Sequence, residues 1–183
     1  MSKNLCWQRT KKSVLLETRV VSVNEYESTS PSGEPGKYIV MDAPDWVITI
    51  PVLENPNRFI MVKQWRHGLN ALSTEFPGGV IDKNEKPEEA AVRELKEETG
   101  YIAQKLELLG SFSPNPAIMS NKVHCFAAYD LVATGKQNLD NDEYVNYFEL
   151  SEEEVFAKMG SEDFPHGLMI AALELYRQNR KKQ

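Results

Sequence analysis

The sequence predicts one α+β domain, in which a mixed sheet packs against a few helices, with a small β extension ahead of it. Three observations lead to this fold class. Runs of β-branched and aromatic residues recur between clusters of Gly, Pro, Ser and Asn, as is typical of strands. From the middle of the chain onward, three segments place apolar residues at a helical spacing. Hydrophobic residues make up 41% of the 183 residues, which is enough to bury a core.

The first elements are expected to be strands. The segment 14–23 is rich in β-branched residues and predicts a strand, and the Ser-, Pro- and Gly-rich segment 28–36 predicts a loop. Two more strands are expected over 38–41 and 46–53, followed by a turn at Asn55–Asn57.

The remaining strands are shorter runs, expected over 59–65, 72–76, 106–109, 122–131 and 144–150. After them, Ser151 and Glu154 have the spacing of a capping box, which predicts a short helix that ends at Gly160. The apolar residues of 168–180 recur with a helical period and predict a final helix.

Composition excludes several classes of protein. The net charge is −6, which argues against nucleic-acid binding through a broad basic surface. No apolar run approaches the ~20 residues of a transmembrane helix, so no membrane partner is expected. The segment 1–10 lacks the apolar core of a signal peptide. Cys6 and Cys125 are the only cysteines, and free thiols suit a reducing compartment, so we expect a cytoplasmic protein.

The segment between Pro87 and Gly100 carries complete helix signals. Pro87 suits the first helical position, and acidic residues follow it in the first turn. Gly100 can adopt the left-handed conformation that ends a helix. Ala91, Val92 and Leu95 share one side, which we expect to pack on the core.

Three carboxylates lie on the other side of this helix. At about 100° per residue, Glu94, Glu97 and Glu98 fall within an arc of about 100°. Like charges at this spacing repel, so they call for a cation between them, and Mg²⁺ suits oxygen ligands that act together with a phosphate substrate. The alternative is a solvated acidic face, which is common on Glu- and Lys-rich helices.

The order of residues around this helix resembles the Nudix box. That motif is Gly, five residues, Glu, seven residues, Arg-Glu, an aliphatic, any residue, Glu-Glu, any residue, Gly and an aliphatic. Only Tyr101 departs from it, at a position that serves packing. The matching residues are Gly79, Glu85, Arg93, Glu94, Leu95, Glu97, Glu98 and Gly100.

The resemblance implies a Nudix-type α/β/α sandwich with a mixed sheet over residues 45–183. Residues 1–44 would be a small N-terminal β extension, and in the ADP-sugar pyrophosphatase branch such an extension builds a homodimer. We therefore expect a homodimer for this chain.

Features outside the box resemble the ADP-ribose and nucleoside-diphosphate-sugar pyrophosphatases. Val62–Arg66 resembles a Gln-aromatic-Arg strand of that branch, and Glu75–Gly79 resembles its entry to the box. Pro116 lies sixteen residues after Gly100, where these enzymes carry a proline. Enzymes of this branch often carry an Arg-Gly pair ahead of their second strand, and its Arg packs on the base. Asp42–Asp45 has no counterpart of this pair, which weakens the case for ADP-ribose itself more than for another nucleoside diphosphate sugar.

The resemblance implies hydrolysis of the diphosphate bridge of a nucleoside diphosphate sugar to a nucleoside monophosphate and a sugar phosphate, with Mg²⁺ or Mn²⁺ as cofactor. The metal ligands would be Glu94, Glu97, Glu98 and the carbonyl of Gly78. Arg93 would orient the carboxylates by charge-assisted hydrogen bonds. Glu85 would tie the loop to the helix or serve outside the metal ligands. Catalysis is expected to depend on Glu97, Glu98, Arg93 and a general base.

Other roles rest on weaker signals. Arg66 is the expected contact to the diphosphate or sugar, with a plain surface arginine as the alternative. Pro116 is expected at the substrate. Glu143 is the preferred base, ahead of Asp140, Asp142 or a box glutamate.

The sequence does not assign a role to several aromatic and histidine side chains. Trp7, Trp46 and Trp65 are each able to stack a base, and the sequence does not choose among them. His67 is a candidate substrate contact, and His124 is expected in the core or at a sheet edge. Rival functions are hydrolysis of an oxidised nucleoside triphosphate or a dinucleoside polyphosphate, and nucleotide sensing without cleavage.

Overall fold

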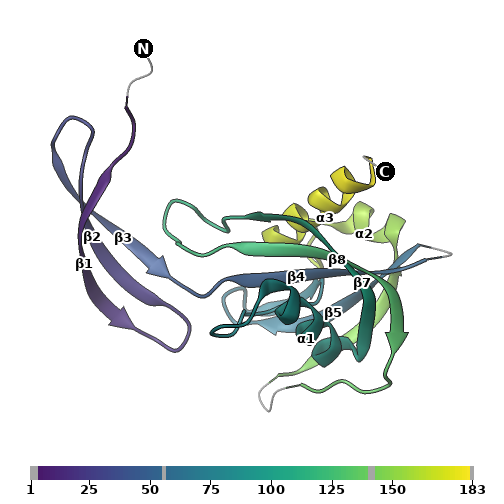
Figure 1. Ribbon diagram of the computed structural model, residues 1–183. Helices are drawn as coiled ribbons and strands as arrows, with labels where there is room; N and C mark the ends of the chain where they lie inside the picture. The colour runs from purple at the N-terminus through teal and green to yellow at the C-terminus, as the bar shows by residue number, and fades with distance from the viewer. Residues whose placement is uncertain (1–3, 55–56, 140–142, 182–183) are drawn as a thin grey trace. The chain divides into compact units, whose positions relative to one another are not determined.

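The computed structural model of the chain describes residues 4–54, 57–139 and 143–181 (Figure 1). Its contacts divide the chain into two compact units. The first comprises Met1–Pro44 and Ser113–Lys122, and the second comprises Asp45–Phe112 and Val123–Gln183. The first unit therefore gains a segment from the middle of the chain. The expected turn at Asn55–Asn57 lies mostly outside the described residues.

Three antiparallel strands make up the sheet of the first unit, in the order β1-β2-β3. They are β1 (Gln8–Glu17), β2 (Ser22–Thr29) and β3 (Pro35–Asp42). Met41 at the end of β3 donates its backbone N–H to the carbonyl of Ile118 at 2.7 Å, which joins the Ser113–Lys122 segment to this sheet.

The prediction of one strand over 14–23 is wrong, because the chain reverses between β1 and β2. Thr18 explains the reversal: its hydroxyl accepts from the Val21 N–H at 2.9 Å and donates to the Val21 carbonyl at 2.7 Å. β-Branched residues on both sides of this turn hid it, since strand propensity continues across it. The predicted loop over 28–36 is also shorter, because β2 and β3 extend into both of its ends.

The second unit holds a six-stranded mixed sheet, as predicted. Its path is β6-β5-β4-β8-β7, with β9 paired to β5. β4 and β8 are parallel, and the other pairs are antiparallel. The strands are β4 (Trp46–Leu53), β5 (Arg58–Arg66), β6 (Ala71–Glu75), β7 (Tyr101–Phe112), β8 (Val123–Ala133) and β9 (Val145–Ser151).

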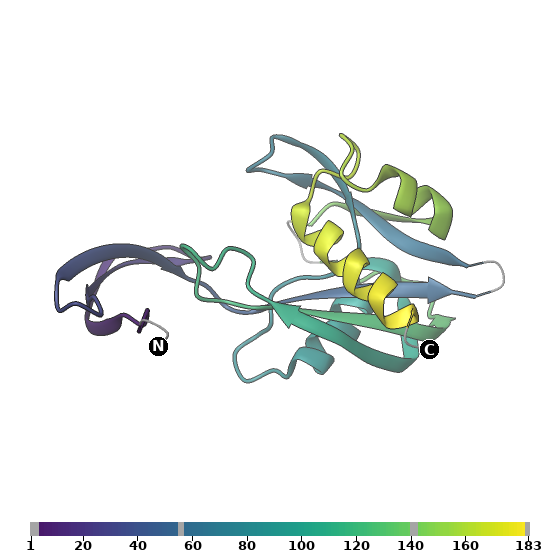
Figure 2. The same ribbon diagram turned by 90° about the horizontal axis from the view of Figure 1, so that it is seen from above.

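Helices cover both faces of this sheet, which gives the three-layer α/β/α arrangement (Figures 1 and 2). Alternate residues of β4 point to opposite faces: Val47 packs with Ala90 and Ala91 of α1, whereas Ile48 and Ile50 join the core under α3. The helices are α1 (Pro87–Thr99), α2 (Glu152–Lys158) and α3 (Gly167–Arg180).

The predicted ends of α1 and the predicted start of α2 are confirmed, whereas α2 already ends at Lys158, before the expected Gly160. Pro87 begins α1, and Gly100 ends it in the left-handed conformation at φ 71°. Ser151 caps α2 by accepting from the Glu154 N–H at 3.2 Å. Within α1, Ala91 and Leu95 are fully buried, while Val92 is only half-buried. The anchoring face of α1 is thus turned slightly from the expected one.

In the described part of the chain, none of the helices is both long and apolar enough to cross a membrane.

Candidate active site

The carboxylate face of α1 opens on a cavity of about 450 Å³. Glu94, Glu97 and Glu98 all line it, as the helical spacing predicted. The opposite wall comes from β5, from the turn before the helix and from the segment before β9. The side chains and turn residues that complete the lining are Gln64, Arg66, Gly78, Gly79, Val80, Asp82, Arg93 and Glu143.

The turn at Gly78 is held against the start of β4. The Thr49 N–H donates to the Pro77 carbonyl at 2.8 Å, and the Val47 N–H donates to the Gly79 carbonyl at 2.9 Å. The Gly78 N–H in turn donates to Glu98 Oε2 at 2.9 Å. A core strand therefore fixes the turn, and the turn fixes one of the carboxylates.

Arg93 links the acidic groups around it. Its Nε and Nη2 donate to the two oxygens of Glu85, each at 2.9 Å. Its Nη1 donates to Glu94 at 2.8 Å and to Glu97 at 3.1 Å, and Nη2 also reaches the Val80 carbonyl at 3.0 Å. The guanidinium thus sets the positions of two cavity carboxylates and ties the loop before α1 to the helix.

Glu98 is the most deeply buried of the three carboxylates, with 3% of its surface exposed. Burial raises its pKa to about 8, the charges of Glu94 and Glu143 push in the same direction, and the Gly78 N–H opposes them. Burial likewise raises the pKa of Glu94, against the influence of Arg93. Without a cation, burial and the neighbouring carboxylates therefore disfavour the charged forms of Glu98 and Glu94, and a bound cation would favour them.

A hard divalent cation fits this donor set. Carboxylate and carbonyl oxygens are the ligands Mg²⁺ prefers, and Mg²⁺ usually binds one or two carboxylates and completes its shell with water and phosphate. In the part of the chain that the structure describes, no three acidic, histidine or cysteine side chains enclose a common point closely enough to hold a metal unaided. Arg93 instead binds Glu94 and Glu97.

Arg66 lies at the cavity wall and pairs with Glu75, whose role the sequence analysis missed. Both guanidinium edges engage the carboxylate, with Nε donating to Glu75 Oε1 at 2.8 Å and Nη2 to Oε2. Glu75 is completely buried, and its hydrogen bonds raise the pKa of Arg66. Alternation along the strand indicates why Glu75 and Arg66 meet. Gln64 and Arg66 lie on the same face of β5 as Val62, and Val62 pairs with Glu75, so Glu75 also lies on that face.

The other predicted site residues fall in different places. Glu143 lines the cavity, whereas Asp140 and Asp142 lie outside the described residues. Pro116 is exposed on the Ser113–Lys122 segment, which belongs to the first unit, so its role at the substrate stays a prediction. His67 is exposed in the loop between β5 and β6.

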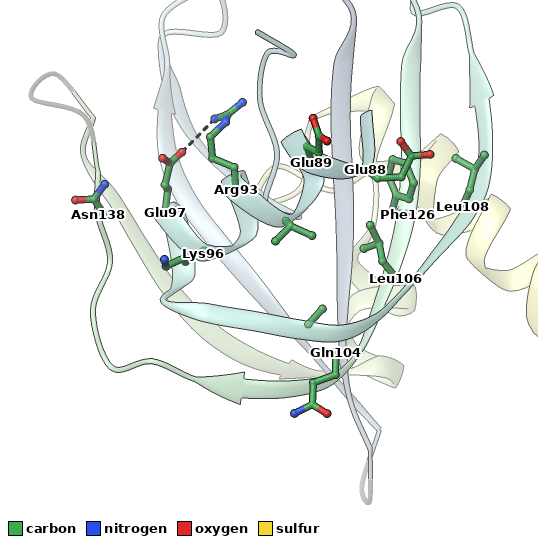
Figure 3. A pocket seen from close by; sticks show the side chains of 12 residues that line it. Glu88, Glu89, Arg93, Lys96, Glu97, Gln104, Leu106, Leu108, Phe126 and Asn138 are labelled. Atoms are coloured by element: carbon green, nitrogen blue, oxygen red, sulfur yellow. Dashed lines mark hydrogen bonds and ion pairs between the residues drawn. The ribbon is translucent and has the colours of Figure 1, made fainter. Parts of the chain in front are cut away.

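A larger cavity of about 930 Å³ lies on the adjoining side of α1 (Figure 3). Its floor is apolar, with Leu106, Leu108 and Phe126 from β7 and β8. Glu97 and Arg93 stand at the end of this cavity and face each other, as the dashed ion pair in Figure 3 shows. This larger cavity includes neither Glu94 nor Glu98, and the Gly78 turn does not line it. The smaller cavity is therefore the candidate reaction site.

Comparison with known proteins agrees with this geometry. The NUDIX domain model matches residues 44–171. An ADP-ribose pyrophosphatase of Bacillus subtilis is 33% identical over 153 residues, which is 83% of this chain and 82% of that protein. A methanol dehydrogenase activator of Bacillus methanolicus is 35% identical over 139 residues, 74% of each chain.

A solved structure, titled as the crystal structure of an ADP compounds hydrolase, superposes with a TM-score of 0.85. It is 26% identical, and the match covers 100% of this chain and 98% of that chain. The chain belongs to the Nudix hydrolase family, and it resembles the ADP-ribose and nucleoside-diphosphate-sugar branch of that family.

Proposed function

We propose that the protein hydrolyses the diphosphate bridge of a nucleoside diphosphate sugar, ADP-ribose or another, with Mg²⁺ or Mn²⁺ as cofactor. The observation that carries this proposal is the convergence of Glu94, Glu97 and Glu98 with Arg66 on one cavity. The names of the Bacillus subtilis relative and of the similar solved structure, an ADP-ribose pyrophosphatase and an ADP compounds hydrolase, support a substrate of this class.

The carboxylates and the arginine that line the cavity have different proposed roles. Glu94, Glu97, Glu98 and the Gly78 carbonyl would hold the metal, which when bound neutralises the diphosphate and stabilises the leaving phosphate. Glu75 holds Arg66 in position through Nε and Nη2, and the remaining N–H groups of Arg66 would bind a diphosphate oxygen.

Glu143 lines the same cavity and is the proposed base. It would take a proton from a water molecule as the water oxygen bonds to one phosphorus and the bridging P–O bond breaks. The sugar phosphate and the nucleoside monophosphate then leave separately. Its Glu143→Gln variant keeps the shape and removes the basic oxygen.

A substrate panel tests the proposal. ADP-ribose, ADP-glucose, UDP-glucose, an oxidised nucleoside triphosphate and a dinucleoside polyphosphate are incubated with millimolar Mg²⁺ or Mn²⁺, and the products are separated by ion-exchange chromatography. We expect a nucleoside monophosphate and a sugar phosphate from at least one of the sugars, and no product after metal removal with EDTA. Turnover of only the triphosphate or the dinucleotide would replace this proposal with the rival hydrolases.

The first unit is, in our proposal, the surface through which two copies form a homodimer. Its sheet leaves Leu15 and Leu16 of β1, Val20 of the turn and Ile39 of β3 between 48% and 65% exposed. Apolar side chains gathered on a sheet of three strands are typical of an association surface.

We expect Leu16→Glu to shift the molecular mass, measured by light scattering after size exclusion, from dimer towards monomer. The control is Ile170→Glu, because Ile170 is 47% exposed on α3 of the second unit. A monomeric wild-type protein at tens of micromolar would contradict the dimer.

A further inference from the structure

A third cavity, of about 260 Å³, lies where the starts of β4 and β8 meet the start of α3. We call it the Trp46 pocket. Its lining is mostly apolar and includes Trp46, Val123, Leu168 and Met169. Trp46 is half-buried, so it packs against the core and still contributes surface to the pocket.

The Trp46 pocket adjoins the carboxylate cavity. Arg66, Gly78, Gly79 and Val80 line both cavities. A substrate whose diphosphate lies beside Arg66 and the carboxylates therefore has this pocket next to it. One of the two groups attached to the diphosphate is within reach of the pocket.

The polar side chains of the pocket are fixed donors. His166 caps α3, and its Nδ1 accepts the Leu168 N–H at 3.2 Å, so the neutral ring carries its proton on Nε2. Burial lowers the pKa of His166, which favours that neutral ring. Arg66 is the other polar side chain here, and it is held in place by Glu75.

This chemistry distinguishes a nucleobase from a sugar. A base has a flat apolar face for Trp46 and ring or carbonyl acceptors at its edge, which match the His166 Nε2–H. A sugar would bring several hydroxyl groups into a mostly apolar pocket with few acceptors, and each unpaired hydroxyl is costly to bury.

We propose that the Trp46 pocket binds the nucleobase of the substrate, with the base stacked on Trp46 and one of its acceptors bound by His166 Nε2–H. This rests on the proposed function, since it assigns one end of a nucleoside diphosphate sugar. It also selects Trp46 among the three tryptophans: Trp65 is 45% exposed on β5 and lines neither cavity, and Trp7 belongs to the first unit.

The test measures product binding by calorimetry, with AMP and ribose 5-phosphate as separate probes in millimolar Mg²⁺. Stacking of a base on an aromatic ring changes affinity by roughly 5- to 150-fold. We therefore expect Trp46→Leu to raise the Kd of AMP about tenfold and leave that of ribose 5-phosphate unchanged. Trp46→Phe should restore most of the AMP affinity, and Trp65→Leu is the matched control.

His166→Ser tests the polar contact. Serine still caps α3 through its hydroxyl, so the melting temperature should stay near that of wild type while AMP binding weakens severalfold. Unchanged AMP binding in both Trp46→Leu and His166→Ser would overturn the proposal, as would weaker binding of ribose 5-phosphate alone.

The AMP-binding experiment and the substrate panel test different claims, so failure of the pocket proposal is distinguishable from failure of the proposed hydrolysis. AMP binding that depends on Trp46 without any turnover would contradict the hydrolysis, whereas turnover without that dependence would contradict only the pocket.

Discussion

Glu98→Gln is expected to lower kcat on a nucleoside diphosphate sugar by more than about 100-fold, since even residues that only support metal ligands are worth about 10- to 100-fold. Glutamine keeps the shape and still offers an oxygen to the Gly78 N–H, which now lies 2.9 Å from Glu98. It removes the negative charge that binds a cation. Steady-state kinetics at saturating Mg²⁺ measure the loss.

The same variant, Glu98→Gln, is expected to keep or increase the stability of the metal-free protein. Glu98 is 3% exposed and its pKa is raised to about 8, so at neutral pH without metal its charged form is disfavoured in the folded protein. Glu98→Gln should therefore melt at or above the wild-type temperature in EDTA, while Mg²⁺ stabilises it less than wild type.

The matched control is Glu88→Gln, which removes an exposed carboxylate from the first turn of the same helix. Losing a favourable charge at a helix start costs about 0.3–1 kcal/mol, so this variant should be slightly less stable and fully active. Equal rates in Glu98→Gln and wild type would exclude Glu98 from the reaction.

Local periodicity predicted α1 and its carboxylate face because every relevant residue is a near neighbour in sequence. The spacing of Glu94, Glu97 and Glu98 fixes their common face once the segment is helical, and Pro87 and Gly100 fix its ends. The same reasoning missed the contacts that depend on pairing between distant strands.

Glu75 shows this limit most clearly. Its sequence position suggested only an entry to the turn, whereas the register of β5 and β6 places it opposite Val62, on the face that Val62 shares with Arg66, where it accepts from the Arg66 guanidinium. Likewise, no local pattern in Ser113–Lys122 indicates that it belongs to the first unit, because that depends on contacts with distant residues such as the hydrogen bond between Met41 and Ile118. The turn at Thr18 was also missed. Strand propensity depends on residue type, so it gives no sign of a chain reversal that one side-chain hydroxyl stabilises.

Gly78→Ala is expected to destabilise the protein by about 2–4 kcal/mol. A Cβ at this position would lie 2.2 Å from the Val47 carbonyl oxygen and 3.1 Å from the Ile48 Cα. Both are backbone atoms of a buried core strand, so the turn has to move instead. That movement breaks the two hydrogen bonds that hold the turn to β4, from Thr49 and from Val47.

Gly79→Ala provides the comparison, because its clash is with a side chain. The added Cβ would lie 2.4 Å from Glu94 Oε1, the far end of a flexible side chain that is able to rotate away. Stability should change by less than about 1 kcal/mol, while kcat falls because Glu94 leaves the position set by Arg93.

Urea unfolding and kcat measured on both variants give the decisive contrast. The structure predicts that Gly78→Ala loses stability first, and that Gly79→Ala loses activity with an almost unchanged unfolding midpoint. The two glycines are adjacent and neither has a positive φ, so backbone preference does not distinguish them. Only the neighbours differ, a core strand for one and a proposed metal ligand for the other. Equal losses of stability in both variants would mean that the turn, and not Glu94, yields at Gly79.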